Sequence, residues 1–148
     1  MWENTLDLMA PYAERGVEAG CFWYGMRGIE ADFAVLCGIP QQINRAQNFD
    51  IPSDDLATLV SALPTEGLVT VAQIHTHPGR ETTHSRWDDG LIVSRKIYSL
   101  VLPHYGKRPC VPNAVSVHEF RGAEWHSLAS KEAAISIRVI SEILDTRS

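Results

Sequence analysis

The sequence predicts an α/β protein: a single domain spanning residues 1–148, with a mixed β-sheet flanked by helices. A chain of 148 residues suits one domain with one core, and 45% hydrophobic with 21% charged residues is ordinary for a globular protein. Segments of helical periodicity are interspersed with short apolar, β-rich runs, which is typical of a sheet covered by helices. No internal repeat, low-complexity tract or long linker divides the chain.

The first predicted elements are a helix and a β-hairpin. Residues 4–15 favour a helix, with Asn4 as its N-cap and with Pro11 shortening or bending it. Two apolar, β-rich runs follow at 17–27 and 31–39. The turn between them contains a glycine, so the two runs are predicted to pair as a hairpin.

The middle of the chain is predicted to form a loop, a second helix and a buried strand. Residues 41–50 are polar and predicted to form the loop. In residues 53–64, apolar residues recur at helical spacing after Ser53, which is a suitable N-cap. Residues 68–77 have the β-branched, apolar character of a buried strand, and Pro78 cannot continue it.

Three further strands and an ambiguous tail complete the predicted order. Residues 98–103, 114–120 and 123–128 are predicted strands, and the last two are joined by a turn that contains Gly122. Apolar residues in 130–144 recur at both helical and strand spacing. We predict a helix for this tail.

Composition and charge restrict the class of partner and the compartment. A formal charge of −5 gives no electrostatic reason to expect nucleic acid or an anionic membrane as partner. The acidic N-terminus is not a signal peptide, and no apolar run is long enough to span a bilayer. The three cysteines, Cys21, Cys37 and Cys110, form no CxxC pair, so we expect buried thiols rather than disulfides or a cysteine zinc site. We therefore predict a cytoplasmic protein.

The segment QIHTHPGRETTHSRWDDG, from Gln73 to Gly90, is the candidate site. His75 and His77 stand at the end of a predicted strand, where an H-x-H pair presents both imidazoles to one face. Two such histidines can chelate one zinc ion. They could instead be two hydrogen-bonded histidines at a strand end.

A third ligand is expected from a helix that opens near Ser85. Asp88 lies three residues later and shares a helical face with Ser85, whereas its rival Asp89 does not. Two histidines and one carboxylate leave a fourth position for water, which is the pattern of a catalytic zinc site with one ion per chain. The spacing H-x-H-x7-S-x2-D should arise by chance in about one in a thousand chains of this composition.

Other polar and aromatic residues nearby have simpler interpretations. Ser85 could serve only as a helix N-cap, although the cap position faces the same cleft. His84 and Glu81 are predicted to face solvent from the loop. Trp87 and Trp125 are expected to be core or rim aromatics rather than platforms for a substrate.

The motif resembles that of the JAMM (MPN-plus) zinc metalloproteases, in their short prokaryotic form. The matching residues are His75 and His77 followed by proline, Ser85 and Asp88, together with an upstream glutamate. Here Glu18 stands in EAGCFWYG, with its first glycine one residue closer than in the commonest form of that element. The resemblance covers roughly residues 14–120. It implies a cytidine-deaminase-like fold and bound Zn²⁺.

The resemblance also assigns roles to the two side chains that are not ligands. A carboxylate outside the metal shell, Glu18, would act as general base toward the zinc-activated water. The hydroxyl of Ser85 would stabilise the developing oxyanion. Glu18 could otherwise be an ordinary carboxylate at the edge of a strand.

Members of this family remove ubiquitin-like proteins from targets or trim their C-terminal tails, so a ubiquitin-like protein or its conjugate is the expected substrate. Other proteins of a ubiquitin-like conjugation operon are possible partners. The loops 38–52 and 102–113 could border a groove for such a tail. Two alternatives are a non-catalytic MPN-type scaffold and a hydrolase of a small amide or sulfur-carrier precursor.

Overall fold

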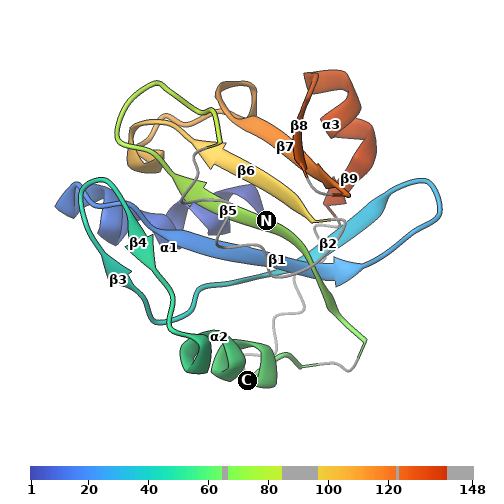
Figure 1. The fold of residues 1–148 in the computed structure, drawn as a ribbon, viewed down its shortest axis with the longest axis horizontal. Coiled ribbons are helices and arrows are strands. Elements are labelled where there is room, and N and C mark those ends of the chain that lie inside the picture. The colour runs from blue at the N-terminus through green and yellow to red at the C-terminus, as the bar shows by residue number, and fades with distance from the viewer. Residues whose placement is uncertain (65–66, 85–96, 123, 140–148) are drawn as a thin grey trace.

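A seven-stranded mixed sheet forms the centre of the computed structural model, which describes residues 1–64, 67–84, 97–122 and 124–139 (Figure 1). Its strands lie in the order β8-β7-β6-β5-β1-β2-β9; the pairs β5–β6 and β2–β9 are parallel and the others antiparallel. The strands are β1 (Gly20–Met26), β2 (Asp32–Gly38), β5 (Val69–Thr76), β6 (Tyr98–Leu102), β7 (Ser116–Arg121), β8 (Glu124–Leu128) and β9 (Ile137–Val139). A separate two-stranded ribbon pairs β3 (Ile43–Asn44) with β4 (Phe49–Asp50).

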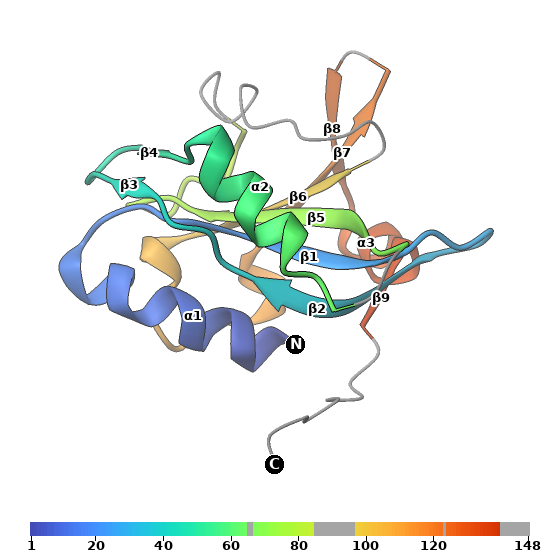
Figure 2. The same ribbon diagram turned by 90° about the horizontal axis from the view of Figure 1, so that it is seen from below.

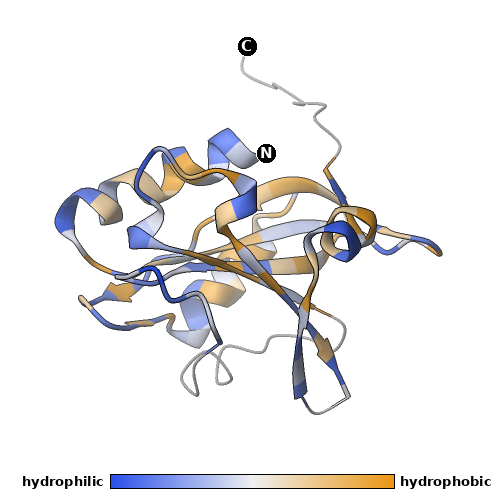
Figure 3. Cartoon of the chain, turned by 90° about the horizontal axis from the view of Figure 1, so that it is seen from above, coloured by the Kyte–Doolittle hydropathy of each residue, from blue (hydrophilic) through white to orange (hydrophobic). Residues whose placement is uncertain are grey.

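Helices cover both faces of the sheet. The described helices are α1 (Trp2–Arg15), α2 (Ser53–Ser61) and α3 (Ser130–Ser136), with 3-10 turns η2 (His104–Gly106) and η3 (Pro112–Ala114). Helix α1 lies on one face and α2 on the other (Figure 2). Hydrophobic residues concentrate along the strands, and hydrophilic ones in the connecting loops (Figure 3).

The hydrophobic core lies between the sheet and α1. Leu6 and Met9 of α1 pack against the side chains that the central strands present to that side, because burying this apolar surface is the main gain of folding. The strand side chains in this cluster are Cys21, Trp23, Ala34, Val71, Ala72, Ile74, Tyr98, Leu100 and Leu102. We call this side of the sheet the core face.

The strand register brings a second set of residues to the opposite side, which we call the histidine face. Gly20 of β1 pairs with His75 of β5, and Gln73 of β5 pairs with Ser99 of β6. Ser99 in turn pairs with His118 of β7. Paired residues lie on the same side of a sheet. Polar side chains from three adjacent strands, β5, β6 and β7, are therefore gathered on one surface.

The structure confirms the predicted hairpin, as β1 and β2, and the predicted strands, but it corrects the helix starts. Helix α1 begins at Trp2 with Met1 as its N-cap, so Asn4 lies inside the helix. The helix also runs on past Pro11 to Arg15, because Ala13 continues its buried face. Helix α2 ends at Ser61, and Pro52 takes the N-cap position predicted for Ser53.

Two segments differ from their prediction more fundamentally. The predicted loop 41–50 contains the β3–β4 ribbon. The predicted helix 130–144 ends at Ser136 and continues as β9, which pairs with the exposed edge of β2. That pairing satisfies backbone groups which a longer helix would leave open. Residues 140–148 lie outside the described part of the chain.

Two of the three cysteines are buried, as predicted. Cys21 and Cys110 are buried, Cys37 is half-buried, and all three are free thiols. The Sγ atoms of Cys21 and Cys37 lie 3.8 Å apart on neighbouring strands. Within the described ranges, no helix has both the length and the apolar character needed to cross a membrane.

Candidate functional site

The two histidines of the HTHP motif lie at the end of the central strand β5. His75 is fully buried, whereas His77 directly follows the strand and is half-buried. The N–H of His77 donates to the carbonyl of Leu102 at 2.8 Å, so strand-like pairing extends beyond Thr76. Both imidazoles therefore lie on the histidine face, as the alternation of a strand requires.

The geometry of these two imidazoles fits a shared tetrahedral metal ion. Their ring centroids lie 5.1 Å apart, with the planes inclined by 54°. With zinc–nitrogen bonds of about 2 Å, two imidazoles at the tetrahedral angle have centroids about 5 Å apart. Nδ1 of His77 lies 3.0 Å from the carbonyl oxygen of Glu81, which can only accept. Nδ1 therefore carries the proton, and Nε2 offers its lone pair to a metal.

Glu18 lies across from His77 at the entrance to β1. The β1–β5 register pairs Gly20 with His75, and the N–H of Thr76 donates to the carbonyl of Ala19 at 3.1 Å. Continuing this register by one residue places Glu18 opposite His77 on the histidine face. Glu18 is only 6% exposed. Three of the five residues that the sequence selected thus lie at the same end of the paired strands β1 and β5.

The β3–β4 ribbon fixes the backbone around Glu18. The N–H of Glu18 donates to the carbonyl of Arg45, and the side-chain amide of Asn44 donates to the carbonyl of Glu18, both at 2.8 Å. The side chain of Gln42 both accepts from the N–H of Gly20 and donates to its carbonyl. Sequence reasoning missed these supporting residues, because they lie in a segment whose polar composition predicts a loop.

Gly20 makes room for an aromatic ring beside the site. A Cβ atom at this position would lie 2.5 Å from Cε2 of Phe49, closer than real Cβ contacts come. Without a side chain at Gly20, the ring of Phe49 packs over β1, with its centroid 6.3 Å from that of His75. The glycine that follows Glu18 in the motif therefore has a packing role.

Ser85 and Asp88, the other two predicted site residues, lie outside the described residues, as do Asp89, Trp87 and the helix expected to open at Ser85. Among residues 1–64, 67–84, 97–122 and 124–139, no group of three His, Cys, Asp or Glu side chains is placed to hold a metal ion. The described residues thus contribute two of the three expected ligands, and both are nitrogen donors.

The predicted solvent-facing position of His84 is wrong. Its Nε2 lies 3.1 Å from the hydroxyl of Ser99, which is itself fully buried. Its ring stacks on Trp125, with centroids 4.3 Å apart, and stands edge-on to His75 at 5.7 Å. His84 therefore packs against the sheet although it lies in a loop. Trp125 is half-buried, as expected of a rim aromatic, whereas Glu81 is exposed, as predicted.

His118 extends this cluster and was not selected from the sequence. It is buried on β7, with its ring 5.4 Å from that of His84. Its Nε2 donates to the carbonyl of Thr82 at 3.2 Å, and the hydroxyl of Thr82 is hydrogen-bonded to that of Ser116. His118 comes to this place through the pairing of β7 with β6. A single histidine in a predicted strand therefore did not indicate a position in this cluster.

The three cysteines have shifted pKa values, and they lie on the core face. A hydrogen bond to Cys37 and burial raise the pKa of Cys21. The same hydrogen bond, together with one from the hydroxyl of Thr5, lowers the pKa of Cys37. Burial raises the pKa of Cys110. These shifts have local structural causes and do not mark a second reactive centre.

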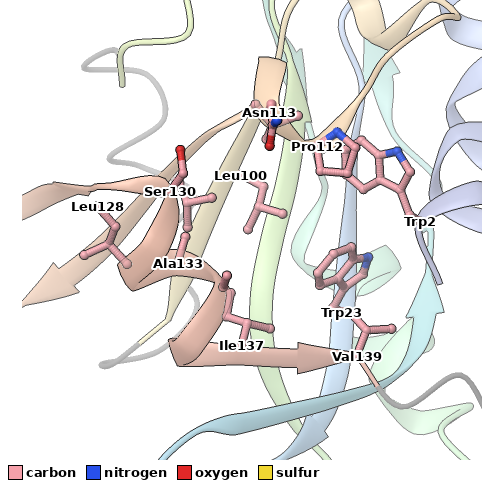
Figure 4. Close-up of a pocket in the computed structure, with 13 residues that line it drawn as sticks. Trp2, Trp23, Leu100, Pro112, Asn113, Leu128, Ser130, Ala133, Ile137 and Val139 are labelled. Atoms are coloured by element: carbon pink, nitrogen blue, oxygen red, sulfur yellow. The ribbon is translucent and has the colours of Figure 1, made fainter.

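An apolar cavity of about 270 Å³ also lies on the core face, away from the histidines (Figure 4). Trp2 of α1 and Trp23 of β1 form one side of it, and residues of α3 and β9 form the other. Its polar lining is limited to Asn113 and Ser130 apart from the indole nitrogens. Such a lining offers no side chain of the kind that binds a metal ion or exchanges protons at neutral pH.

Comparisons with known proteins identify a relative in sequence and a relative in fold. No family model matches the chain. The chain is 34% identical over 136 residues to the probable metalloprotease y4jG of Sinorhizobium fredii; the match covers 86% of this chain and 81% of that protein. The solution structure of a protein from Desulfitobacterium hafniense has a similar fold, with a TM-score of 0.65 at 15% identity over 95% of this chain and 90% of the other. That likeness concerns the fold alone.

Proposed function

The chain belongs to the family of the probable metalloprotease y4jG, and we propose that it is a zinc-dependent JAMM-type peptidase with an MPN-like fold that acts on the C-terminal tail of a ubiquitin-like protein. One observation carries the proposal: the imidazoles of His75 and His77 have the spacing of two ligands on one metal ion, and Glu18 lies opposite them. Family membership supports an enzyme over a non-catalytic scaffold.

Three side chains would hold the zinc ion, and two have places in the structure. His75 and His77 would provide imidazole nitrogens, and Asp88 would provide a carboxylate oxygen. The hydrogen bond from His77 to the carbonyl of Glu81 orients that ring. When bound in such a set, zinc acts as a Lewis acid that lowers the pKa of water from about 15.7 toward 7.

The protein's own groups would move the protons. The carboxylate of Glu18 accepts the proton of the attacking water and passes it to the leaving amine. Its burial and the hydrogen bonds that fix its backbone keep it in place for this transfer. The hydroxyl of Ser85 donates to the developing oxyanion. The stacked rings of His84 and Trp125 lie beside His75 on the histidine face.

A flexible, narrow substrate suits a site at the end of a central strand. The tail of a ubiquitin-like protein can be laid beside the sheet in an extended conformation, with its junction at the metal. Cleavage would occur in the cytoplasm, with proteins of a ubiquitin-like conjugation operon as further partners. A small amide or a sulfur-carrier precursor is the alternative substrate class, which the same groups could hydrolyse.

Zinc content and cleavage, measured together, test the proposal. The purified chain should hold about one zinc per chain and should cleave a ubiquitin-like protein with a linear tail or an isopeptide-linked target. His77→Ala should lose the zinc and the activity while staying folded, because a metal site of this kind depends on each ligand. Asp88→Asn should weaken zinc binding, whereas the matched control Asp89→Asn should not.

Each outcome of this experiment has a distinct meaning. Metal-free protein with full activity would contradict the metalloprotease mechanism. A folded protein that holds no zinc would favour the scaffold. Cleavage of the precursor but not of the isopeptide would restrict the substrate to linear tails. Loss of zinc in Asp89→Asn alone would show that the third ligand is misassigned.

A further inference from the structure

A basic pocket lies next to the loop that carries His77. It encloses about 260 Å³, and Arg80, His104 and Lys107 contribute its polar side chains. Prolines and Ala114 provide much of the remaining lining. A pocket whose lining combines apolar side chains with nitrogen donors is suited to a small group with negative charge.

A strained turn forms part of the pocket, and it is hydrogen-bonded to the loop that contains His77 and Gly79. His104 and Tyr105 have positive φ angles of 53° and 59°, which residues with a side chain rarely adopt. The N–H of His104 donates to the carbonyl of Gly79 at 2.9 Å, and the N–H of Tyr105 donates to that of His77 at 2.8 Å. Strain of this kind persists where the surroundings impose it and is concentrated at functional sites.

The cations of this pocket have no carboxylate partner among the described residues, in contrast to their neighbour. Arg108 pairs with both Glu3 and Asp7 at 2.9 Å. Within the described ranges, Arg80 and Lys107 take part in no ion pair, and Nζ of Lys107 lies 6.0 Å from the centroid of the Tyr105 ring. Arg80 and Lys107 thus form a local concentration of positive charge in a chain whose formal net charge is −5.

We propose that this pocket binds a carboxylate of the substrate, close to the bond that is cleaved. The inference rests on the proposed function, because the ligand is taken to be part of a peptide held at His75 and His77. Arg80 is three residues from His77, so their Cα atoms lie at most about 11 Å apart. When the bond to be cleaved lies at His75 and His77, a carboxylate within two or three residues of that bond can therefore lie in the pocket. It comes from an acidic side chain or from the free C-terminus of the tail, and Arg80 can receive it with two parallel hydrogen bonds.

Three short peptide probes, titrated into the full chain and followed by NMR, test the pocket without requiring cleavage. One probe has a free C-terminal carboxylate, the second is its amide, and the third is the amide with one aspartate side chain. A carboxylate-bearing probe should shift the resonances of Arg80 and of the turn at His104 to Lys107, and the plain amide should not. Which of the two carboxylate probes binds identifies the source of the charge.

Charge removal measures the contribution of each cation. Arg80→Gln and Lys107→Gln should each weaken binding of the carboxylate probe about fivefold, the upper range for an exposed ion pair. Lys131→Gln, an exposed site on α3, removes the same charge outside the pocket and should leave binding unchanged. Equal binding of the plain amide, or equal weakening by Lys131→Gln, would overturn the proposal.

Cleavage assays on the same variants separate this inference from the function on which it rests. For a carboxylate-bearing substrate, Arg80→Gln should raise KM about fivefold with zinc content unchanged. If no peptide is cleaved but the probes bind as described, the peptidase proposal fails and the pocket stands as a carboxylate site. If peptides are cleaved with the same KM by wild type and Arg80→Gln, the pocket proposal fails and the peptidase stands.

Discussion

The two faces of the central sheet bury different kinds of side chain, although the same strands supply both. Ile74 and Leu100 on the core face pack against α1, whereas His75 and Ser99, their immediate neighbours, are buried on the histidine face. A one-residue step along a strand thus separates a stabilising contact from a candidate ligand. Because polar burial requires hydrogen-bond partners, the histidine face depends on exact placement, whereas the core face depends on volume.

The sharpest test of this division replaces the carboxylate of Glu18 by an amide. Glu18→Gln keeps the size of the side chain but removes the proton acceptor, so kcat should fall by about 10²–10⁴-fold. Zinc content, substrate affinity and the free energy of unfolding should stay close to those of wild type. The measurements are steady-state kinetics, metal analysis and urea denaturation.

An exposed glutamate provides the matched control for that experiment. Glu14→Gln on the outer side of α1 makes the same chemical change and should leave kcat unaltered. If Glu18→Gln loses its zinc, the carboxylate is a ligand and not the base. If it keeps full activity, the base is another carboxylate, and Glu81 is the next to test.

The converse change, on the core face of β5, should affect stability alone. Ile74 is 1% exposed, and Ile74→Ala leaves a cavity that should lower the free energy of unfolding by about 2–5 kcal/mol. Below the unfolding transition, zinc content and kcat should match those of wild type, although His75 is the next residue. Val69→Ala, at a 40% exposed position of β5, should cost far less. A large loss of kcat in folded Ile74→Ala would show that the two faces are coupled.

Sequence patterns sufficed for the features that depend on local order. Alternation and apolar runs predicted the strands, and the H-x-H spacing placed His75 and His77 on one face. The position of His118 beside His84 depends on the pairing of β6 with β7, which no local pattern encodes. The switch from α3 to β9 arises because the edge of β2 accepts a partner, so a tertiary contact overrides helical periodicity. The roles of Ser85 and Asp88 still rest on the motif.

A smaller effect is expected from Tyr24, which lies on the histidine face but beneath α2. Its hydroxyl is buried and, within the described part of the chain, has no hydrogen-bond partner. Tyr24→Phe removes this uncompensated polar atom and should raise the free energy of unfolding by about 1 kcal/mol. Tyr105 is the matched control, because its hydroxyl donates to the carbonyl of Ala46 at 3.1 Å, so Tyr105→Phe should lower stability. Urea denaturation at neutral pH measures both.

The pH dependence of stability gives the same residue a second signature. Burial raises the pKa of Tyr24 from 10 to about 12 in the folded protein. Between these pH values the unfolded chain ionises this phenol, whereas the folded chain keeps it protonated. The ionisation of Tyr24 therefore does not affect the free energy of unfolding below pH 10 and lowers it as the pH rises toward 12. Wild type should therefore lose more stability than Tyr24→Phe across this interval. Parallel curves for the two proteins would mean that the hydroxyl of Tyr24 reaches water in the folded protein.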